Sequence, residues 1–309
     1  MKPLVSIVIP CFNAAPWLRR CIESALAQTW PEKEIFVADD GSTDESPGIF
    51  RSFGDAIRVI ACPHKGAPHA RNAGLAAARG EWVQFLDADD YLEAPKIAMQ
   101  LAEAAGGADV LYSPVIVETW RDDRAIERVI HPLEPESDLY ERWLTLQLPQ
   151  TGAALWRTDA IRKIGGWNET MPCGQDHELY FRALQTGLRF EATVSSHAIY
   201  RIWSESTLCR KDPLQVIDVR TTLVRQFIDW LRETGRLTPR HQRAAGRICF
   251  EMARQFARHD PDGAANYHRA RRAEGLITIE GPAAPLPYRI AYHTLGFAAA
   301  ERLATLRRS

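Results

Sequence analysis

Trp82-Val83-Gln84-Phe85-Leu86-Asp87-Ala88-Asp89-Asp90 is a mostly apolar segment that ends in three carboxylates within four positions. A short apolar run of this kind is typical of a buried strand in a parallel sheet. The carboxylates then lie at the end of that strand, where open parallel sheets bind ligands. Because neighbouring negative charges repel one another, a divalent cation among them is one interpretation. The other is an acidic turn with a helix cap before Pro95.

The segments around this stretch alternate between strand-like and helix-like patterns. Strands are expected at residues 4–9, 34–38, 58–61, 82–86 and 110–117, and helices at 15–28, 67–79 and 95–105. This alternation predicts an α/β fold with a Rossmann-like, mostly parallel sheet and helices on both faces. Three of the strands end in polar loops, at Pro10–Asn13, Asp39–Ser42 and Asp87–Asp90. Such repetition favours a binding edge over three unrelated turns.

The second half of the chain changes character. Residues 118–148 are an acidic connection with poor periodicity, and a helix is expected to begin at Gln175. After Pro213 the pattern is helical, with segments at 214–234, 239–259, 264–274 and 286–308. We therefore divide the chain into a first domain, 1–203, and a helical C-terminal region, 204–309. Lys and Arg number 20 against 28 Asp and Glu in the first, but 18 against 11 in the second, which suggests two roles.

The overall composition is that of a soluble globular protein, with a net charge of −1 over 309 residues. The apolar run at residues 4–9 is too short for a signal peptide, and no window approaches the roughly 18 apolar residues of a membrane span. Cysteines 11, 21, 62, 173, 209 and 249 form no C-x-x-C pair, which indicates free thiols in a reducing compartment. We expect a cytoplasmic protein.

Three further positions carry polar groups suited to binding or catalysis. Asp39-Asp40-Gly41-Ser42 can accept hydrogen bonds from a base or sugar, or it is an ordinary Asp-Gly turn. Arg71 lies near a helix N-terminus, where a phosphate would bind, although a surface arginine fits the same position. Asp176 lies where a helix begins, either as a cap or as a general base that activates a hydroxyl.

Several familiar catalytic patterns are absent from the sequence. It contains no G-x-S-x-G, no H-E-x-x-H and no Cys/His cluster at ligand spacing. The loop Pro10–Pro16 contains no glycine, so it cannot be a Walker or Rossmann phosphate loop. These absences exclude serine hydrolases with a nucleophile elbow, zincins and P-loop nucleotidases.

Taken together, the motifs resemble those of the family 2 glycosyltransferases, which have an A-type glycosyltransferase fold. The resemblance covers about residues 4–203 and rests on several segments in the family's order. These are Val5–Asn13, Ser24–Thr29, Asp39–Asp44, Ala70–Gly74 and Phe85–Asp90, with weaker matches at Ile164–Trp167 and Gln175–Leu179. It implies transfer of a sugar from a nucleotide-diphosphate sugar, with a UDP-sugar favoured, and inversion at the anomeric carbon.

The resemblance also implies roles for individual residues. Pro10, Phe12 and Asp40 would hold the base and ribose, and Arg71 and Ala88 would lie beside the nucleotide. Asp87 would contact the ribose or assist the metal, Asp89 would ligate Mn²⁺ or Mg²⁺, and Asp176 would be the catalytic base. This agrees with the chemistry, because a divalent ion stabilises a leaving diphosphate and a carboxylate removes the proton of the attacking hydroxyl.

Two positions depart from the family pattern. Gln175 precedes Asp176 where the family often has Glu, which removes one charge. Trp203 ends Tyr200-Arg201-Ile202-Trp203 where the family often has His. Because an indole cannot ligate a metal, we expect either weaker metal binding or a Trp203 that stacks on an acceptor or donor sugar.

The sequence is also compatible with two functions other than sugar transfer. One is a non-catalytic nucleotide-sugar-binding relative, and the other is a sugar-nucleotide pyrophosphorylase, which would need a glycine-rich basic loop after the first strand. For the basic C-terminal region, the alternatives are simple helical packing and peripheral contact with a membrane. Membrane contact would suit a saccharide or lipid-linked acceptor in bacterial surface polysaccharide or glycolipid assembly. We expect no nucleic-acid partner.

Overall fold

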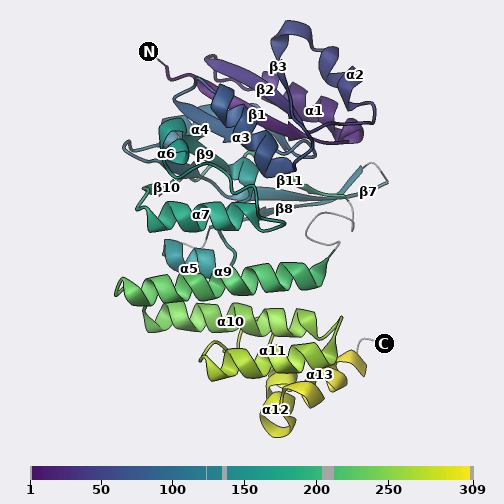
Figure 1. Cartoon of the computed structure of the whole chain (residues 1–309), viewed down its shortest axis with the longest axis vertical. Helices are drawn as coiled ribbons and strands as arrows, with labels where there is room; N and C mark the ends of the chain where they lie inside the picture. The colour runs from purple at the N-terminus through teal and green to yellow at the C-terminus, as the bar shows by residue number, and fades with distance from the viewer. Residues whose placement is uncertain (1, 123, 134–137, 204–211, 307–309) are drawn as a thin grey trace. The chain divides into compact units, whose positions relative to one another are not determined.

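The computed structural model of the chain describes residues 2–122, 124–133, 138–203 and 212–306. These residues form two compact units (Figure 1). The first comprises Met1–Pro135 and Leu148–Ser204, and the second comprises Glu136–Gln147 and Glu205–Ser309. We call them the sheet unit and the helical unit.

Two sheets build the sheet unit. The larger has seven strands in the order β10-β6-β9-β4-β1-β2-β3, and the smaller has four in the order β5-β11-β7-β8. The strands are β1 (Val5–Cys11), β2 (Lys33–Asp39), β3 (Arg58–Ala61), β4 (Trp82–Phe85), β5 (Tyr91–Leu92), β6 (Val110–Tyr112), β7 (Val115–Arg121), β8 (Arg124–His131), β9 (Ala154–Arg157), β10 (Phe190–Ala192) and β11 (Ala198–Ile202). In the larger sheet β9 runs antiparallel to both neighbours, while the other pairings are parallel. The predicted mostly parallel sheet is confirmed.

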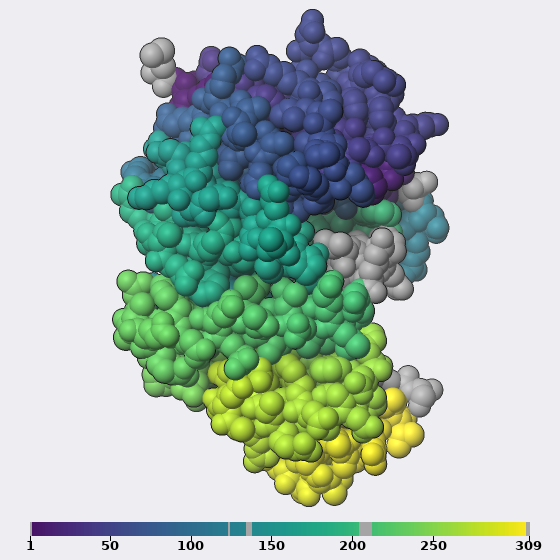
Figure 2. All heavy atoms as spheres, in the orientation of Figure 1, coloured from purple at the N-terminus to yellow at the C-terminus, as the bar shows by residue number. Residues whose placement is uncertain are grey.

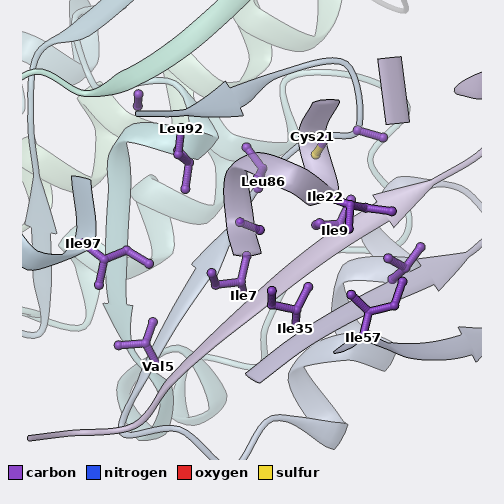
Figure 3. Packing of buried hydrophobic residues seen from close by; sticks show 14 of the residues in the cluster. Val5, Ile7, Ile9, Cys21, Ile22, Ile35, Ile57, Leu86, Leu92 and Ile97 are labelled. Carbon is purple, nitrogen blue, oxygen red and sulfur yellow. The ribbon is translucent and has the colours of Figure 1, made fainter. Parts of the chain in front are cut away.

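Helices cover both faces of the central strand β1. The helices of this unit are α1 (Ala15–Leu26), α2 (Ser46–Arg51), α3 (Ala67–Ala77), α4 (Lys96–Glu103), α6 (Thr158–Lys163) and α7 (Gln175–Gln185). Ile7 and Ile9 share one buried cluster with Ile22 of α1 (Figure 3). Val8 faces the other way, where a Cβ on Gly74 of α3 would lie 2.3 Å from its Cγ1. Only glycine at 74 allows α3 to pack this closely on the sheet.

The single strand expected at 110–117 is wrong. The chain instead forms β6 and β7, which belong to different sheets and are separated by Ser113 and Pro114. Proline has no N–H group for a ladder hydrogen bond, so it suits a point where the chain leaves one sheet for another. The apolar pattern runs through this break because β6 is buried throughout and the first residues of β7, Val115 to Val117, are buried or half-buried.

The connection at 118–148 is more ordered than its weak periodicity indicated. Its first part completes the β7–β8 hairpin, and its last part contains α5 (Leu139–Leu144). In the helical unit, Trp143 of α5 stacks on Phe227 with ring centroids 4.0 Å apart. Residues 138–147 thus group with the C-terminal helices, although we assigned them to the first domain. The functional boundary at residue 203 stays a prediction.

The other helices of the helical unit are α9 (Pro213–Glu233), α10 (Pro239–Phe256), α11 (Pro261–Ala273), α12 (Leu286–Leu295) and α13 (Phe297–Leu306). One continuous helix over 286–308 is wrong, because Gly296 breaks it with a positive φ of 80°. Residues 307 and 308 lie outside the described residues. In the described chain, no helix is both long and apolar enough to cross a membrane. No disulfide joins the described cysteines, and Cys209 lies outside them.

Candidate active site

The polar loops expected to form a binding edge follow neighbouring parallel strands. β1 pairs with β2 on one side and with β4 on the other, so their carboxyl ends lie at one edge of the sheet. Hydrogen bonds connect the loops directly to these ends: Asp40 N–H donates to the Cys11 carbonyl at 2.7 Å, and Leu86 N–H donates to that of Val8 at 3.0 Å. The structure therefore brings the three predicted loops to a common edge.

The carboxylate of Asp40 is fully engaged by the main chain. It is 2% exposed, and its two oxygens accept hydrogen bonds from the N–H groups of Lys65 and Gly66 at 2.8 and 2.7 Å. The carbonyl of Asp40 lies 2.9 Å from Nδ1 of His64. Asp40 thus fixes the loop between β3 and α3 against the end of β2.

Phe12 follows β1 and is 46% exposed, in contrast to the buried Pro10 before it. Its ring lies 4.2 Å from the ring of His64, tilted by 30°. Because Asp40 fixes His64, the two rings form a held, open aromatic pair at the β1–β2 edge. A flat heteroaromatic group such as a nucleobase is suited to stack on such a pair.

Arg71 links the end of β4 to the start of α7. Its Nη2 lies 2.6 Å from Oδ1 of Asp87, and its Nη1 donates to Oε1 of Gln175 at 3.0 Å. The guanidinium also lies over the ring of Trp167, 4.3 Å from its centroid. Arg71 is only 6% exposed, so it is not the free surface arginine of the alternative interpretation. Gln175 uses its amide oxygen where a glutamate would have used a carboxylate.

Asp90, the last carboxylate of the opening motif, has a packing role. It is 1% exposed and accepts hydrogen bonds from the N–H of Arg201 at 2.8 Å and from Nε2 of Gln150 at 2.7 Å. Burial, together with the charges of Asp89 and Asp87, raises its pKa well above the usual range. Asp90, which accepts a hydrogen bond at each carboxyl oxygen, anchors the turn after β4 to β11.

The carboxylate of Asp89 accepts one hydrogen bond from another residue, whereas that of Asp90 accepts two. Its Oδ2 accepts a hydrogen bond from Nε1–H of Trp203 at 3.0 Å, and Nε of Arg201 donates to its backbone carbonyl. Burial and the negative charge of Asp87 raise the pKa of Asp89, while the Trp203 bond and the charge of Arg201 lower it. An ionised Asp89 is therefore under-compensated and would be stabilised by an added cation.

Asp176 is the second residue of α7, after Gly174, which has a positive φ of 63°. Its Oδ1 accepts a hydrogen bond from the N–H of His177 at 2.9 Å. Burial raises the pKa of Asp176, whereas that hydrogen bond and the charge of Arg71 lower it. The net rise gives a carboxylate more basic than an exposed aspartate, as a general base requires.

The family assignment follows from a match over the strands that build this edge. The sequence model of glycosyl transferase family 2 matches residues 6–165, which is more than half of the chain. The chain belongs to glycosyl transferase family 2. The resemblance in the motifs is thereby confirmed.

This family 2 member matches longer proteins over part of their length. It is 41% identical over 107 residues to the uncharacterized glycosyltransferase EpsJ of Bacillus subtilis, a match covering 34% of this chain and 31% of EpsJ. It is 38% identical over 104 residues to a hyaluronan synthase of Pasteurella multocida, covering 33% of this chain and 11% of the synthase. The chain thus spans a third or less of these two relatives.

Solved structures with the same fold cover nearly all of this family 2 member. TarS of S. aureus in complex with UDP-GlcNAc gives a TM-score of 0.65 at 17% identity, covering 97% of this chain and 89% of that one. A mannosyltransferase of Pyrobaculum calidifontis in complex with GDP-Man and Mn²⁺ gives 0.55 at 17% identity, covering 99% and 88%. These similarities confirm the A-type glycosyltransferase fold.

The two carboxylates expected to bind a metal fit a hard cation only together with other ligands. In the described part of the chain, no group of three or more His, Cys, Asp or Glu side chains is arranged to hold a metal ion. Magnesium, however, is often bound by one or two carboxylates and the phosphates of a substrate. The raised pKa of Asp89 indicates uncompensated negative charge at this point. The residues thus fit a cation that binds with a diphosphate.

Sequence reasoning missed three residues that complete the site. His64 pairs with Phe12, Gln150 bonds to Asp90, and Arg201 contacts both Asp89 and Asp90. Arg201 stood beside Trp203 in a recognised motif, and that position was the available signal. His64 and Gln150 lie in segments without a motif, so only the structure reveals them.

Proposed function

We propose that this family 2 member is an inverting glycosyltransferase that moves a sugar from a nucleotide-diphosphate sugar to a hydroxyl acceptor. The observation that carries the proposal is the position of Arg71, which joins Asp87 at the end of β4 to Gln175 beside Asp176. This contact holds the predicted donor-binding edge and the predicted base in one rigid arrangement. A UDP-sugar is the favoured donor, consistent with a structural neighbour solved with UDP-GlcNAc.

The nucleoside would bind at the β1–β2 edge. Phe12 and His64 offer a stacking surface for the base, and the buried Pro10 sets the direction of the Phe12 loop. Asp40 would contribute by fixing the Lys65–Gly66 turn through two backbone hydrogen bonds. Its carboxylate oxygens have further lone pairs, which would accept hydrogen bonds from the base or ribose. Both Asp40 oxygens already accept hydrogen bonds, so its main effect would be on the conformation of the loop beside the nucleoside.

The diphosphate would bind at the end of β4. Arg71 keeps Asp87 in place for the ribose or the metal. The side chain of Ala88 is buried in the apolar core, so any contact of Ala88 with the nucleotide would be through its main chain. Asp89, assisted by Asp87, would hold Mn²⁺ or Mg²⁺. When bound, this ion supplies Lewis-acid stabilisation of the charge that develops on the leaving diphosphate. A fold neighbour was solved with Mn²⁺.

Asp176 would take the proton of the acceptor hydroxyl as that oxygen attacks the anomeric carbon. One carboxylate is sufficient for a single inverting displacement, because no covalent intermediate has to form. The electron pair of the broken bond leaves on the diphosphate. The charge of Arg71 lowers the pKa of Asp176 and so favours its ionised form, against the rise that burial causes.

Trp203 would form part of the sugar or acceptor subsite. Its ring is 40% exposed and lies 5.3 Å from the ring of Trp17, while its N–H remains bonded to Asp89. An exposed aromatic ring beside the reaction centre suits stacking on a sugar ring. We place the acceptor in bacterial surface polysaccharide or glycolipid assembly, with the enzyme in the cytoplasm and its C-terminal region at the inner face of the membrane.

A thermal-shift panel of UDP, GDP, dTDP and CDP, each with and without Mn²⁺, tests the donor proposal. Because a ligand of the folded state raises the melting temperature by mass action, the true nucleotide should stand out. We expect UDP to give the largest shift, and only with Mn²⁺. A panel without any shift would contradict the proposal.

A non-catalytic nucleotide-sugar-binding relative is the second candidate. It is favoured by the Trp203–Asp89 bond, which occupies a carboxylate oxygen expected to face the metal. Donor binding without sugar transfer or donor hydrolysis would support it. A pyrophosphorylase remains disfavoured, because Pro10–Pro16 has no glycine-rich loop for a triphosphate.

A further inference from the structure

Helices α12 and α13 already use one face each for the core of the helical unit. Tyr292 of α12 and Phe297 of α13 both contact His268 of α11, with an OH to Nε2 distance of 2.9 Å and a ring stacking distance of 4.4 Å. Arg254 of α10 adds a buried ion pair to Glu301 at 2.5 Å. These contacts fix the inner faces of the two helices.

Their outer faces carry large apolar side chains in solvent. Leu286 and Ile290 of α12 and Leu303 of α13 are 62, 58 and 44% exposed. Leu286 and Ile290 are four residues apart, so they project from the same side of α12. Figure 2 shows atoms of these two helices (yellow) open at the surface of the helical unit. The core of the helical unit is already formed by the inner faces of these helices, so the exposed side chains are additional to that core.

The charges among these apolar residues are of one sign. Between residues 282 and 306 the only acidic side chain is Glu301, which is buried and paired with Arg254. Arg289 and Arg302 are exposed and, in the described part of the chain, have no carboxylate partner. An apolar face flanked by unpaired arginines is complementary to a surface that is apolar inside and anionic outside.

We propose that Leu286, Arg289, Ile290, Arg302 and Leu303 form a lipid-docking face that binds an anionic membrane surface. The leucine and isoleucine side chains enter the boundary between head groups and acyl chains, and the two arginines contact lipid phosphates. The face lies on one rigid end of the helical unit, so binding requires no unfolding. The inference rests on the proposed membrane contact of the C-terminal region and assigns it to five residues.

Vesicle sedimentation of the full chain tests this face. The probes are vesicles of phosphatidylcholine alone and of equal parts phosphatidylcholine and phosphatidylglycerol, at low and high salt. We expect binding only to the anionic vesicles, a loss of tenfold or more in L286S/I290S, and a loss of a few fold in R289Q/R302Q that disappears at high salt. The matched controls L214S and R232Q, on α9, should bind as the parent does. Circular dichroism checks that every variant folds.

Three outcomes would overturn the inference. Equal binding of L286S/I290S and the parent would move any membrane contact to another part of the chain. Absence of parental binding to anionic vesicles would also remove the proposed membrane contact, without affecting nucleotide binding in the thermal-shift panel. A concentration-dependent dimer in light scattering that L286S/I290S converts to a monomer would assign the face to a second copy of the chain.

Discussion

The chain has two strand ends with paired aspartates, and they differ in what surrounds the carboxylates. At the end of β2, Asp40 has both oxygens bonded to main-chain N–H groups. At the end of β4, Asp89 has one side-chain hydrogen bond, from Trp203, and its pKa is raised by burial and by Asp87. The same residue type at the same edge is therefore satisfied in one loop and under-compensated in the other.

This difference shows how a structural aspartate is distinguished from a ligand-binding one. A carboxylate that accepts two backbone hydrogen bonds is stable without a cation, whereas a buried carboxylate beside another needs one. The motif alone does not separate the two cases, because Asp-Asp follows an apolar strand in both. The decisive information is the number of donors that the fold places around each carboxylate.

The largest effect is expected outside both strand ends, at the base. Asp176→Asn should lower kcat by about 10³-fold or more, because an amide cannot accept the proton of the acceptor. Sugar transfer measured at saturating donor checks this. The thermal shift with UDP and Mn²⁺ should persist in this variant. If transfer continued at the parental rate, Asp176 would not be the general base.

Asp89→Asn should lower transfer by about 10²–10³-fold, because a main stabilising contact to the leaving diphosphate is lost. Without nucleotide, the variant should be at least as stable as the parent at pH 8, because the repulsion between Asp89 and Asp87 is relieved. Kinetics and thermal unfolding give the two readouts. A fall in stability with unchanged metal dependence would show that Asp89 has a structural role and that the end of β4 does not bind the cation.

Asp40→Asn is the matched change at the other strand end. The NH₂ group of the asparagine would then face a backbone N–H, so two donors would meet without an acceptor. This should lower the free energy of unfolding by about 1–3 kcal/mol. Urea unfolding measures this cost. The Mn²⁺ dependence of nucleotide binding should stay as in the parent, even if affinity falls. Full stability of the Asp40→Asn variant would mean that the Lys65–Gly66 turn does not depend on the Asp40 carboxylate.

The pH dependence should report the burial of Asp176. Because the pKa of Asp176 is raised, this carboxyl group ionises at a higher pH than an exposed aspartate does. A general base acts in its ionised form, so kcat/KM should rise with pH as Asp176 loses its proton. Arg71→Met removes a charge that lowers this pKa, so the acidic limb of the pH profile should move to higher pH. A limb that stays in place in this variant would separate Arg71 from the base.

The smallest change is expected at Trp203. Trp203→Phe keeps an aromatic ring but removes the N–H that bonds Asp89, so Mn²⁺ should bind a few fold more tightly in the presence of UDP. Titration of Mn²⁺ followed by thermal shift measures the change. Trp203→Ala should in addition weaken acceptor binding, seen as a higher KM. If Mn²⁺ affinity is equal in the parent and the Phe variant, the indole bond does not compete with the metal.

Sequence patterns predicted the elements whose signal is local. The alternating strands and helices around the Asp87–Asp90 turn are confirmed, and the fold follows from them. The antiparallel strand β9 was missed, because its direction depends on pairing with β4 and β6, which are distant in sequence. The six-residue helix α5 was missed because so short an element carries little periodicity.

The candidate site divides in the same way. Asp40, Asp89 and Asp176 were predicted from motifs, because each follows a strand or begins a helix in a recognisable pattern, and their roles stay predictions. Their partners were not, since the Trp203–Asp89 bond spans 114 residues and the Gln150–Asp90 bond spans 60. Such contacts depend on tertiary packing, and no local pattern encodes them. Yet these contacts decide which aspartate is left with uncompensated charge.

We propose that the end of β4, and not the end of β2, binds the donor diphosphate with a divalent cation. The most direct measurement is the melting temperature of the parent, Asp89→Asn and Asp40→Asn with UDP, with and without Mn²⁺. We expect an Mn²⁺-dependent shift in the parent and in Asp40→Asn, and none in Asp89→Asn. An Mn²⁺-dependent shift that survives in Asp89→Asn and vanishes in Asp40→Asn would contradict it.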